Sequence, residues 1–109
     1  MGITKTEGFT EEITQMAELL KALGHPARLS IMEFLLNSPA CICGDIVEEL
    51  PLAQSTVSRH LSELKRVGLI QGNIDGNNIC YCINTDTWDK VAHFFTDFKN
   101  KKVVTSSCC

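Results

Sequence analysis

The sequence predicts a mainly α-helical domain that carries one β-hairpin, and three observations support this fold class. Apolar residues recur at helical spacing in four segments, at about residues 10–23, 26–36, 55–67 and 87–99. Asp75-Gly76 separates two short alternating runs, which is a strong hairpin signal. A length of 109 residues supports one domain with a modest core.

The first two helices follow one another closely. Gly24 ends the first helix, and His25-Pro26 opens the second, because proline is well tolerated at the first helical position. The second helix is expected to continue to the break at residues 37–39. Its expected buried face consists of Leu29, Met32, Leu35 and Leu36.

A helix-turn-helix is expected next. A short third helix spans about Gly44 to Leu50, and the turn at residues 51–54 leads to the fourth helix, which Gly68 stops. The inner face of the fourth helix consists of Val57, Leu61 and Leu64.

The last helix follows the hairpin and carries a wide apolar stripe. The stripe predicts both core packing and pairing with a second copy of the chain. Its members are Trp88, Val91, Ala92, Phe94, Phe95 and Phe98. The complete prediction is a winged helix-turn-helix of about five helices. Residues 1–99 form the DNA-binding and dimerisation domain, and residues 100–109 form a flexible tail that contains cysteines.

Composition narrows the class of protein. The net charge of −3 argues against strong nonspecific binding to nucleic acid, although basic residues concentrate in the fourth helix. The absence of a signal core and of a long apolar run predicts a cytoplasmic protein without membrane contact. In a reducing cytoplasm, six cysteines favour metal binding or redox sensing over structural disulfides. No pattern of catalytic residues is present, so we expect no enzyme.

Two linked motifs carry a family resemblance that covers about residues 10–98. Leu20 to Ile31 resembles the second-helix entry of the ArsR/SmtB bacterial metalloregulators. Ser55 to Leu61, followed by Leu64 and Gly68-Leu69-Ile70, resembles their recognition helix and wing entry. The resemblance implies a homodimer, paired through its first and last helices, that represses transcription and leaves double-stranded operator DNA when an inducer binds. It implies no permanently bound cofactor.

The fourth helix supplies the expected DNA contacts. Gln and Arg can bond base edges, whereas Ser, Thr and His usually position phosphates. The expected contacts are Gln54, Ser55, Thr56, Ser58, Arg59 and His60. The plainer interpretation is a solvated amphipathic helix.

Cys41 and Cys43 match the Cys-x-Cys that the arsenical-responsive branch of this family carries at the start of its third helix. Soft thiolates select soft ions, so the resemblance implies As(III) or Sb(III) as inducer. A thiolate at the N-terminus of a helix is also favoured by the helix dipole. The plainer interpretation is a pair of buried small hydrophobic residues.

The sequence leaves open which residue supplies a third sulfur ligand. Cys108 or Cys109 could complete the site, could hold an arsenical alone, or could belong to an inert tail. Cys80 and Cys82 alternate with Tyr81 in a wing strand, so both are expected to face outward as surface residues.

Two alternatives remain on the sequence alone. The same repressor could sense Cd, Pb, Zn or another thiophilic metal ion, or the oxidation or persulfidation of a cysteine pair. A thiol-rich metal-buffering protein that uses the scaffold only to dimerise is less favoured.

Overall fold

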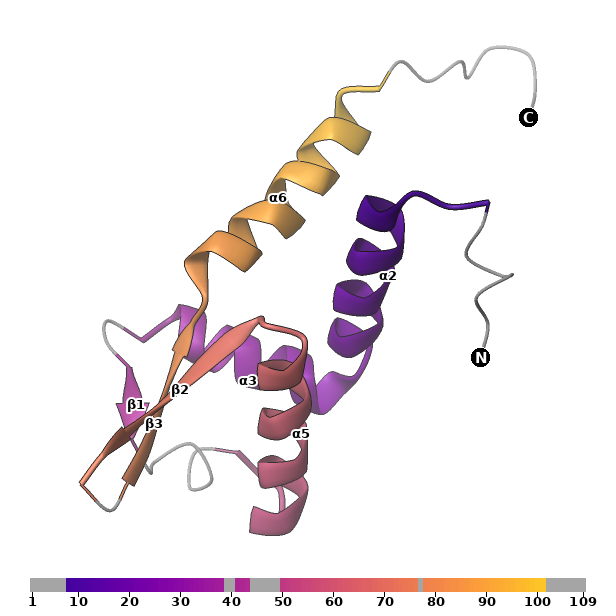
Figure 1. Cartoon of the computed structure of the whole chain (residues 1–109). Coiled ribbons are helices and arrows are strands. Elements are labelled where there is room, and N and C mark those ends of the chain that lie inside the picture. Colours follow the sequence, from indigo (N-terminus) through magenta and orange to yellow (C-terminus); the bar gives the residue numbers. More distant parts are fainter. Residues whose placement is uncertain (1–7, 39–40, 44–49, 77, 102–109) are drawn as a thin grey trace.

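The computed structural model describes residues 8–38, 41–43, 50–76 and 78–101, and within them it confirms the winged-helix architecture (Figure 1). The described helices are α2 (Glu11–Leu23), α3 (Pro26–Leu36), α5 (Gln54–Arg66) and α6 (Thr85–Lys99). The described strands are β1 (Ile42–Cys43), β2 (Ile70–Asp75) and β3 (Asn78–Ile83).

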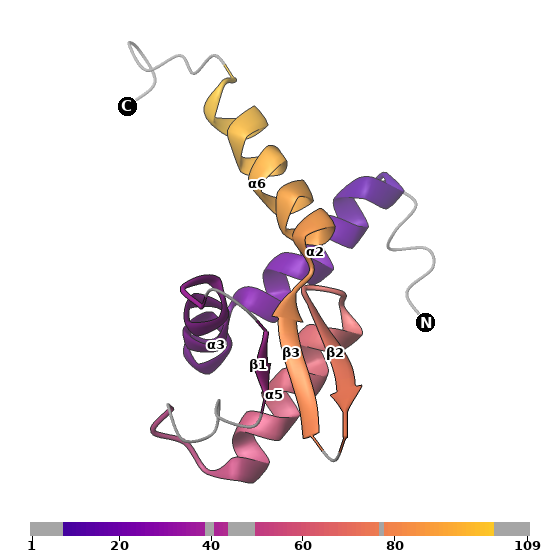
Figure 2. The same ribbon diagram turned by 90° about the vertical axis from the view of Figure 1, so that its left-hand side faces the viewer.

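The three strands form one antiparallel sheet in the order β1-β3-β2 (Figure 2). Strands β2 and β3 form the predicted hairpin, which pairs from Ile70 opposite Ile83 to Asp75 opposite Asn78. Gly76 lies in its turn with a φ of 63°, a conformation that glycine adopts without steric cost. The central strand is therefore β3, because it has a neighbour on each edge.

Strand β1 was not predicted from the sequence. Ile42 and Cys43 form a strand that pairs with Tyr81 and Cys80 of β3. A β-branched residue such as Ile42 suits a strand, and this strand directly precedes the expected start of the third helix. The predicted third helix lies largely at residues 44–49, outside the described residues. Most of the predicted tail, residues 102–109, also lies outside them.

The helix ends follow the local sequence signals. The hydroxyl of Thr10 accepts a hydrogen bond from the backbone N–H of Ile13 and so caps α2. Beyond the end of α5, Gly68 has a φ of 89° and donates to the carbonyl of Lys65, while Leu69 donates to the carbonyl of Leu64. These two bonds form a Schellman motif, which turns the chain directly from α5 into β2.

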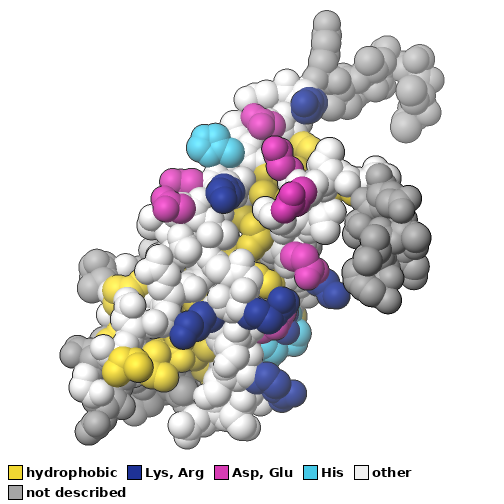
Figure 3. Space-filling model, viewed as in Figure 1, with side chains coloured by type: hydrophobic (Ala, Val, Ile, Leu, Met, Phe, Trp, Pro, Cys, Tyr) yellow, Lys and Arg dark blue, Asp and Glu magenta, His cyan; other side chains and the backbone are white. Residues whose placement is uncertain are grey.

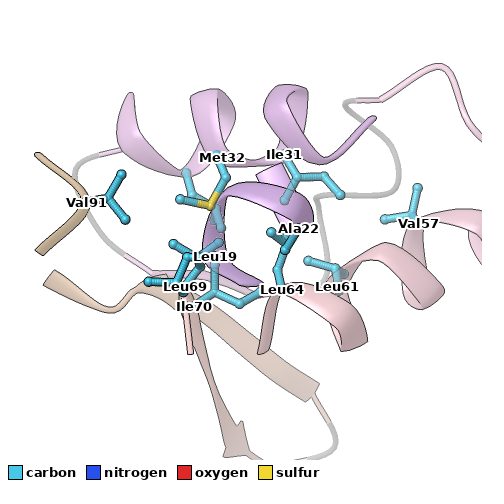
Figure 4. Packing of buried hydrophobic residues seen from close by; sticks show 11 residues of the cluster. Leu19, Ala22, Ile31, Met32, Val57, Leu61, Leu64, Leu69, Ile70 and Val91 are labelled. Carbon is cyan, nitrogen blue, oxygen red and sulfur yellow. The ribbon is translucent and has the colours of Figure 1, made fainter. Parts of the chain in front are cut away.

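The core lies where α2, α3, α5 and the start of β2 meet (Figure 4). The predicted inner face of α5 is confirmed, since all three of its residues are buried. The prediction for α3 was wrong for Leu29 and Leu36, which are 53% and 43% exposed, while Ile31 is buried. One face of α3 packs on both α2 and α5, and this face carries the buried residues Ile31, Met32 and Leu35.

Helix α6 projects away from the sheet and from α5 in both ribbon views. Its first turns contact the core through buried Val91 and half-buried Trp88. Phe95 and Phe98, further along the helix, are 50% and 54% exposed. The apolar stripe of α6 is therefore only half covered within one chain. None of the described helices is long and apolar enough to cross a membrane.

Candidate DNA-reading helix and cysteine site

Helix α5 presents its leading turns to solvent. Gln54, Ser55, Ser58 and Arg59 are exposed, while Thr56 is half-buried. No side chain caps the N-terminus of α5, since Ala53 occupies the cap position. The backbone N–H groups of the first turn are therefore left for an outside acceptor, and a DNA phosphate is such an acceptor.

The sixth predicted DNA contact, His60, is half-buried and bonded within the protein. Its Nδ1 accepts a hydrogen bond of 3.1 Å from Nε of Arg28, and the Arg28 guanidinium also donates to the carbonyl of Ala22. Arg28 thus joins α3 to both α2 and α5. The contact of Arg28 with His60 was not predicted from the sequence, because the two residues lie 32 positions apart along the chain.

The His60 ring also lies against His25, with ring centroids 4.4 Å apart. Burial lowers the pKa of His60 from its ordinary value, because burial disfavours the charged ring. The neighbouring His25 ring and the positive charges of Arg28 and Arg59 lower that pKa further. His60 is therefore favoured in its neutral form, which leaves Nδ1 able to accept from Arg28. His25 acts as the predicted helix-entry residue, since its Nδ1 accepts from the N–H of Ala27.

Charge is unevenly distributed over the surface. Figure 3 shows Lys and Arg side chains gathered over the part of the molecule that contains α5, while most visible Asp and Glu side chains lie over α2 and α6. At the far end of α5, Arg66 forms a two-pronged ion pair with Glu63 at 2.6 and 2.9 Å. This hydrogen bonding lowers the pKa of Glu63. Arg59, nearer the start of α5, is exposed to solvent.

The cysteines form a site between β1 and the wing. Cys41 is exposed and is joined by a disulfide to half-buried Cys82, with their Cα atoms 4.6 Å apart. In the strand register, Cys43 lies opposite Cys80. Cys80 is disulfide-bonded as well. In this oxidised form, the described residues contain no group of three or more His, Cys, Asp or Glu side chains placed to hold a metal ion.

Cys80 was expected to face solvent, and this expectation was wrong, because it is only 6% exposed. Tyr81 and Ile83 pack toward the core, which places Cys80 and Cys82 on the other face of β3. Strand β1 pairs alongside β3 at Cys80. The sequence did contain a signal for this pairing, since both Cys-x-Cys segments have the period of two that is typical of a strand.

A second notable surface is the groove between α2 and α6, with a volume of about 650 Å³. Apolar side chains of Ile13, Met16, Leu19 and Phe94 line it, together with the polar or charged side chains of Glu12, Gln15, Lys90, His93 and Asp97. Ile13 is 43% exposed. The groove therefore exposes apolar side chains among polar ones.

Comparison with known proteins identifies the family. The family model described as "Bacterial regulatory protein, arsR family" matches residues 25–71, which contain α3, β1 and α5. The transcriptional repressor PagR of Bacillus anthracis is 43% identical over 68 residues, which cover 62% of this chain and 68% of PagR. An uncharacterized HTH-type transcriptional regulator of Methanocaldococcus jannaschii is 37% identical over 76 residues, which cover 68% of this chain and 84% of that protein.

Solved structures agree on the fold. An ArsR-like transcriptional regulator from Rhodococcus sp. RHA1 superposes with a TM-score of 0.70 at 21% identity, covering 83% of this chain and 84% of that chain. The architecture and the sequence matches agree. This chain belongs to the ArsR family of bacterial regulatory proteins, which are transcriptional regulators and not enzymes.

Proposed function

We propose that this chain is a homodimeric repressor that binds operator DNA through α5 and leaves it when As(III) or Sb(III) is captured at Cys41 and Cys43. The observation that carries the proposal is the bond between Cys41 and Cys82. It links the segment that precedes α5 to the wing, so chemistry at Cys41 acts on both parts of a DNA-binding winged helix.

On the DNA side, the proposal assigns base contacts to Gln54 and Arg59. Ser55, Thr56 and Ser58 would then position phosphates, together with the uncapped N-terminus of α5. His60 would act mainly through Arg28, which holds α5 against α3. Most of the acidic side chains visible in Figure 3 lie over α2 and α6, apart from the lysines and arginines over α5, which supports DNA binding at α5 despite the net negative charge.

Exposed apolar side chains on α2 and α6 support the proposed dimerisation. Phe95, Phe98 and Ile13 are each more than two-fifths exposed, and burying large apolar side chains is favourable. A second copy would cover them in a twofold arrangement. Two copies of α5 would then face two half-sites of a twofold-related operator.

A second candidate inducer is an oxidant, and the Cys41–Cys82 disulfide favours it specifically. The two thiols would lose two protons and two electrons to a hydroperoxide, which would be reduced to an alcohol and water. The disulfide would then tie β1 to β3. Cd(II), Pb(II) and Zn(II) remain thiophilic alternatives for the reduced site.

The deciding experiment is a gel-shift titration on DNA from upstream of the protein's own gene. Protein reduced with a phosphine is titrated in parallel with arsenite, cadmium and peroxide. We expect release by arsenite, and we expect Cys41→Ser/Cys43→Ser to keep DNA binding but lose the response. Release by peroxide alone would favour the oxidant. Absence of any sequence-selective shift would contradict the repressor itself.

A matched pair of variants tests the assignment of α5. Arg59→Ala removes the exposed arginine of the leading turns and should weaken operator binding by about 1–3 kcal/mol. Arg66→Ala removes an arginine that is already paired with Glu63 at the other end of the helix, and it should change binding little. Equal losses from both variants would contradict reading by the leading turns of α5.

A further inference from the structure

The two Cys-x-Cys segments face each other across adjacent antiparallel strands. The disulfide joins Cys41 to Cys82. Two residues further along, Cys43 lies opposite Cys80 in the strand register. Residues two apart on a strand point to the same face, so Cys80 and Cys82 share one face of β3, where Cys41 is bonded to Cys82. Ile42 and Tyr81, between them, pack toward the core instead.

We infer that the wing strand completes the inducer site, so that Cys41 and Cys82 form its centre and the next pair, Cys43 and Cys80, supplies the third sulfur. The ligand class is a soft trivalent arsenic or antimony species, bound within one protomer. The inference rests on the proposed function. It differs from the sequence expectation that Cys108 or Cys109 could complete the site.

The spacing of the strands supports a shared site. The Cα atoms of Cys41 and Cys82 are 4.6 Å apart, close enough for their sulfurs to be bonded. Cys80 lies two residues from Cys82, about 6.8 Å along the strand, since a strand rises about 3.4 Å per residue. Once the disulfides are reduced, an ion bound by Cys41 and Cys82 thus has the thiol of Cys80 two residues further along β3.

Preorganisation favours the cysteines of β1 and β3 as ligands of the inducer. Backbone pairing already orders β1 and β3, so a ligand that bridges them orders little additional chain. Lower ordering cost raises the affinity of a site for its ligand. Cys80 is also largely buried, and a thiolate–arsenic bond is favoured away from water.

The binding chemistry transfers no electrons. Arsenite, As(OH)₃, exchanges each As–O bond for an As–S bond, and the thiol proton leaves with the hydroxide as water. The disulfide form cannot take part, because its sulfurs carry no exchangeable proton. A phosphine reductant first returns the disulfide-bonded cysteines, Cys41, Cys82 and Cys80, to thiols. For each disulfide one phosphine accepts oxygen from water and becomes the phosphine oxide. The oxidised and arsenic-bound forms therefore exclude one another.

The test measures arsenite binding to the full-length protein, reduced with a phosphine that contains no competing thiol. The As–S absorption in the ultraviolet gives affinity and stoichiometry. We expect one arsenic per protomer, and a loss of affinity of at least about tenfold for Cys82→Ser, because one linked donor of the chelate is removed. Cys108→Ser/Cys109→Ser is the matched control and should bind like the unsubstituted protein.

The neighbouring pair sharpens the test. Cys43→Ser and Cys80→Ser alone should each weaken binding less than the double substitution, because either sulfur can serve as the third ligand. Retained operator binding by reduced Cys82→Ser shows that this variant folds. Unchanged arsenite affinity in Cys82→Ser, or its loss in the tail variant, would overturn the inference. Arsenite binding that requires Cys82 but does not release DNA would instead contradict the proposed function and leave the site standing.

Discussion

Strand β3 is paired on both edges, but its two neighbours are held in different ways. Strand β2 matches it at six register positions, precedes it across a tight turn, and begins at Ile70 in the core. Strand β1 matches it at two positions and is held by the covalent bond of Cys41 to Cys82. The hairpin therefore depends on packing and backbone bonds, whereas the attachment of β1 depends on sulfur chemistry. Only the second attachment can respond to a thiol reagent.

The largest expected effect comes from the anchor of the hairpin. Leu69 is fully buried, donates to the carbonyl of Leu64 and accepts from the N–H of Asn84. Leu69→Ala should lower the free energy of unfolding by about 2–5 kcal/mol, because it leaves a cavity where α5 passes into β2. Denaturant unfolding measures the change.

Ile74→Ala is the control for this prediction. It removes a large apolar side chain from the same hairpin at a position that is 82% exposed. Its effect should stay within about 0.5 kcal/mol. A comparable loss in both variants would mean that the hairpin is not anchored through Leu69.

The next effect concerns the attachment of β1. The Cys41–Cys82 disulfide spans a sequence separation of 41 residues, so reducing it should cost about 2–4 kcal/mol of stability by freeing the unfolded chain. Unfolding of the oxidised and reduced protein measures this difference. Cys82→Ser should lower the stability of the oxidised protein, while Cys108→Ser should leave it unchanged. Equal stability of the oxidised and reduced protein would remove the distinction between the two edges of β3.

The same contrast explains what the sequence could predict. The hairpin, the inner face of α5, and the ends of α2 and α3 were predictable, because each depends on neighbours within a few residues. Gly68 and Gly76 both mark positions with a positive φ, and both were identified as breaks or turns. These features are local, so their signals lie in short stretches of sequence.

Strand β1 and the site between β1 and β3 were not predicted, because they depend on pairing across about 40 residues. A Cys-x-Cys segment fits a helix start as well as a strand, and only its partner strand decides between them. The roles of Arg28 and Cys82 were missed for the same reason. Leu29 and Leu36 show the related limit that periodicity identifies apolar faces but not which face is covered.

The smallest expected effect is on the pH dependence of stability, and it tests the hydrogen bond between Arg28 and His60, which holds α5 without any cysteine. Because folding lowers the pKa of His60, the unfolded chain binds its proton more readily than the folded protein does. This contribution to stability is complete above the ordinary pKa of 6.5, and it is lost as the pH falls from there through the lower pKa of the folded state. His60→Gln keeps an acceptor for Arg28 and should flatten the decline of stability measured between pH 7 and about pH 5.

The control is His93→Gln, since His93 is exposed on α6 and its ring contacts the carbonyl of Asp89 in its own helix. This variant keeps His60 and Arg28, so it should keep the decline of stability toward pH 5. Reduction of the disulfide should lower the whole profile without changing its slope, because it leaves His60 and Arg28 in place. A slope that vanished on reduction would show that His60 and the cysteine site act as one unit, and the two attachments would then not be independent.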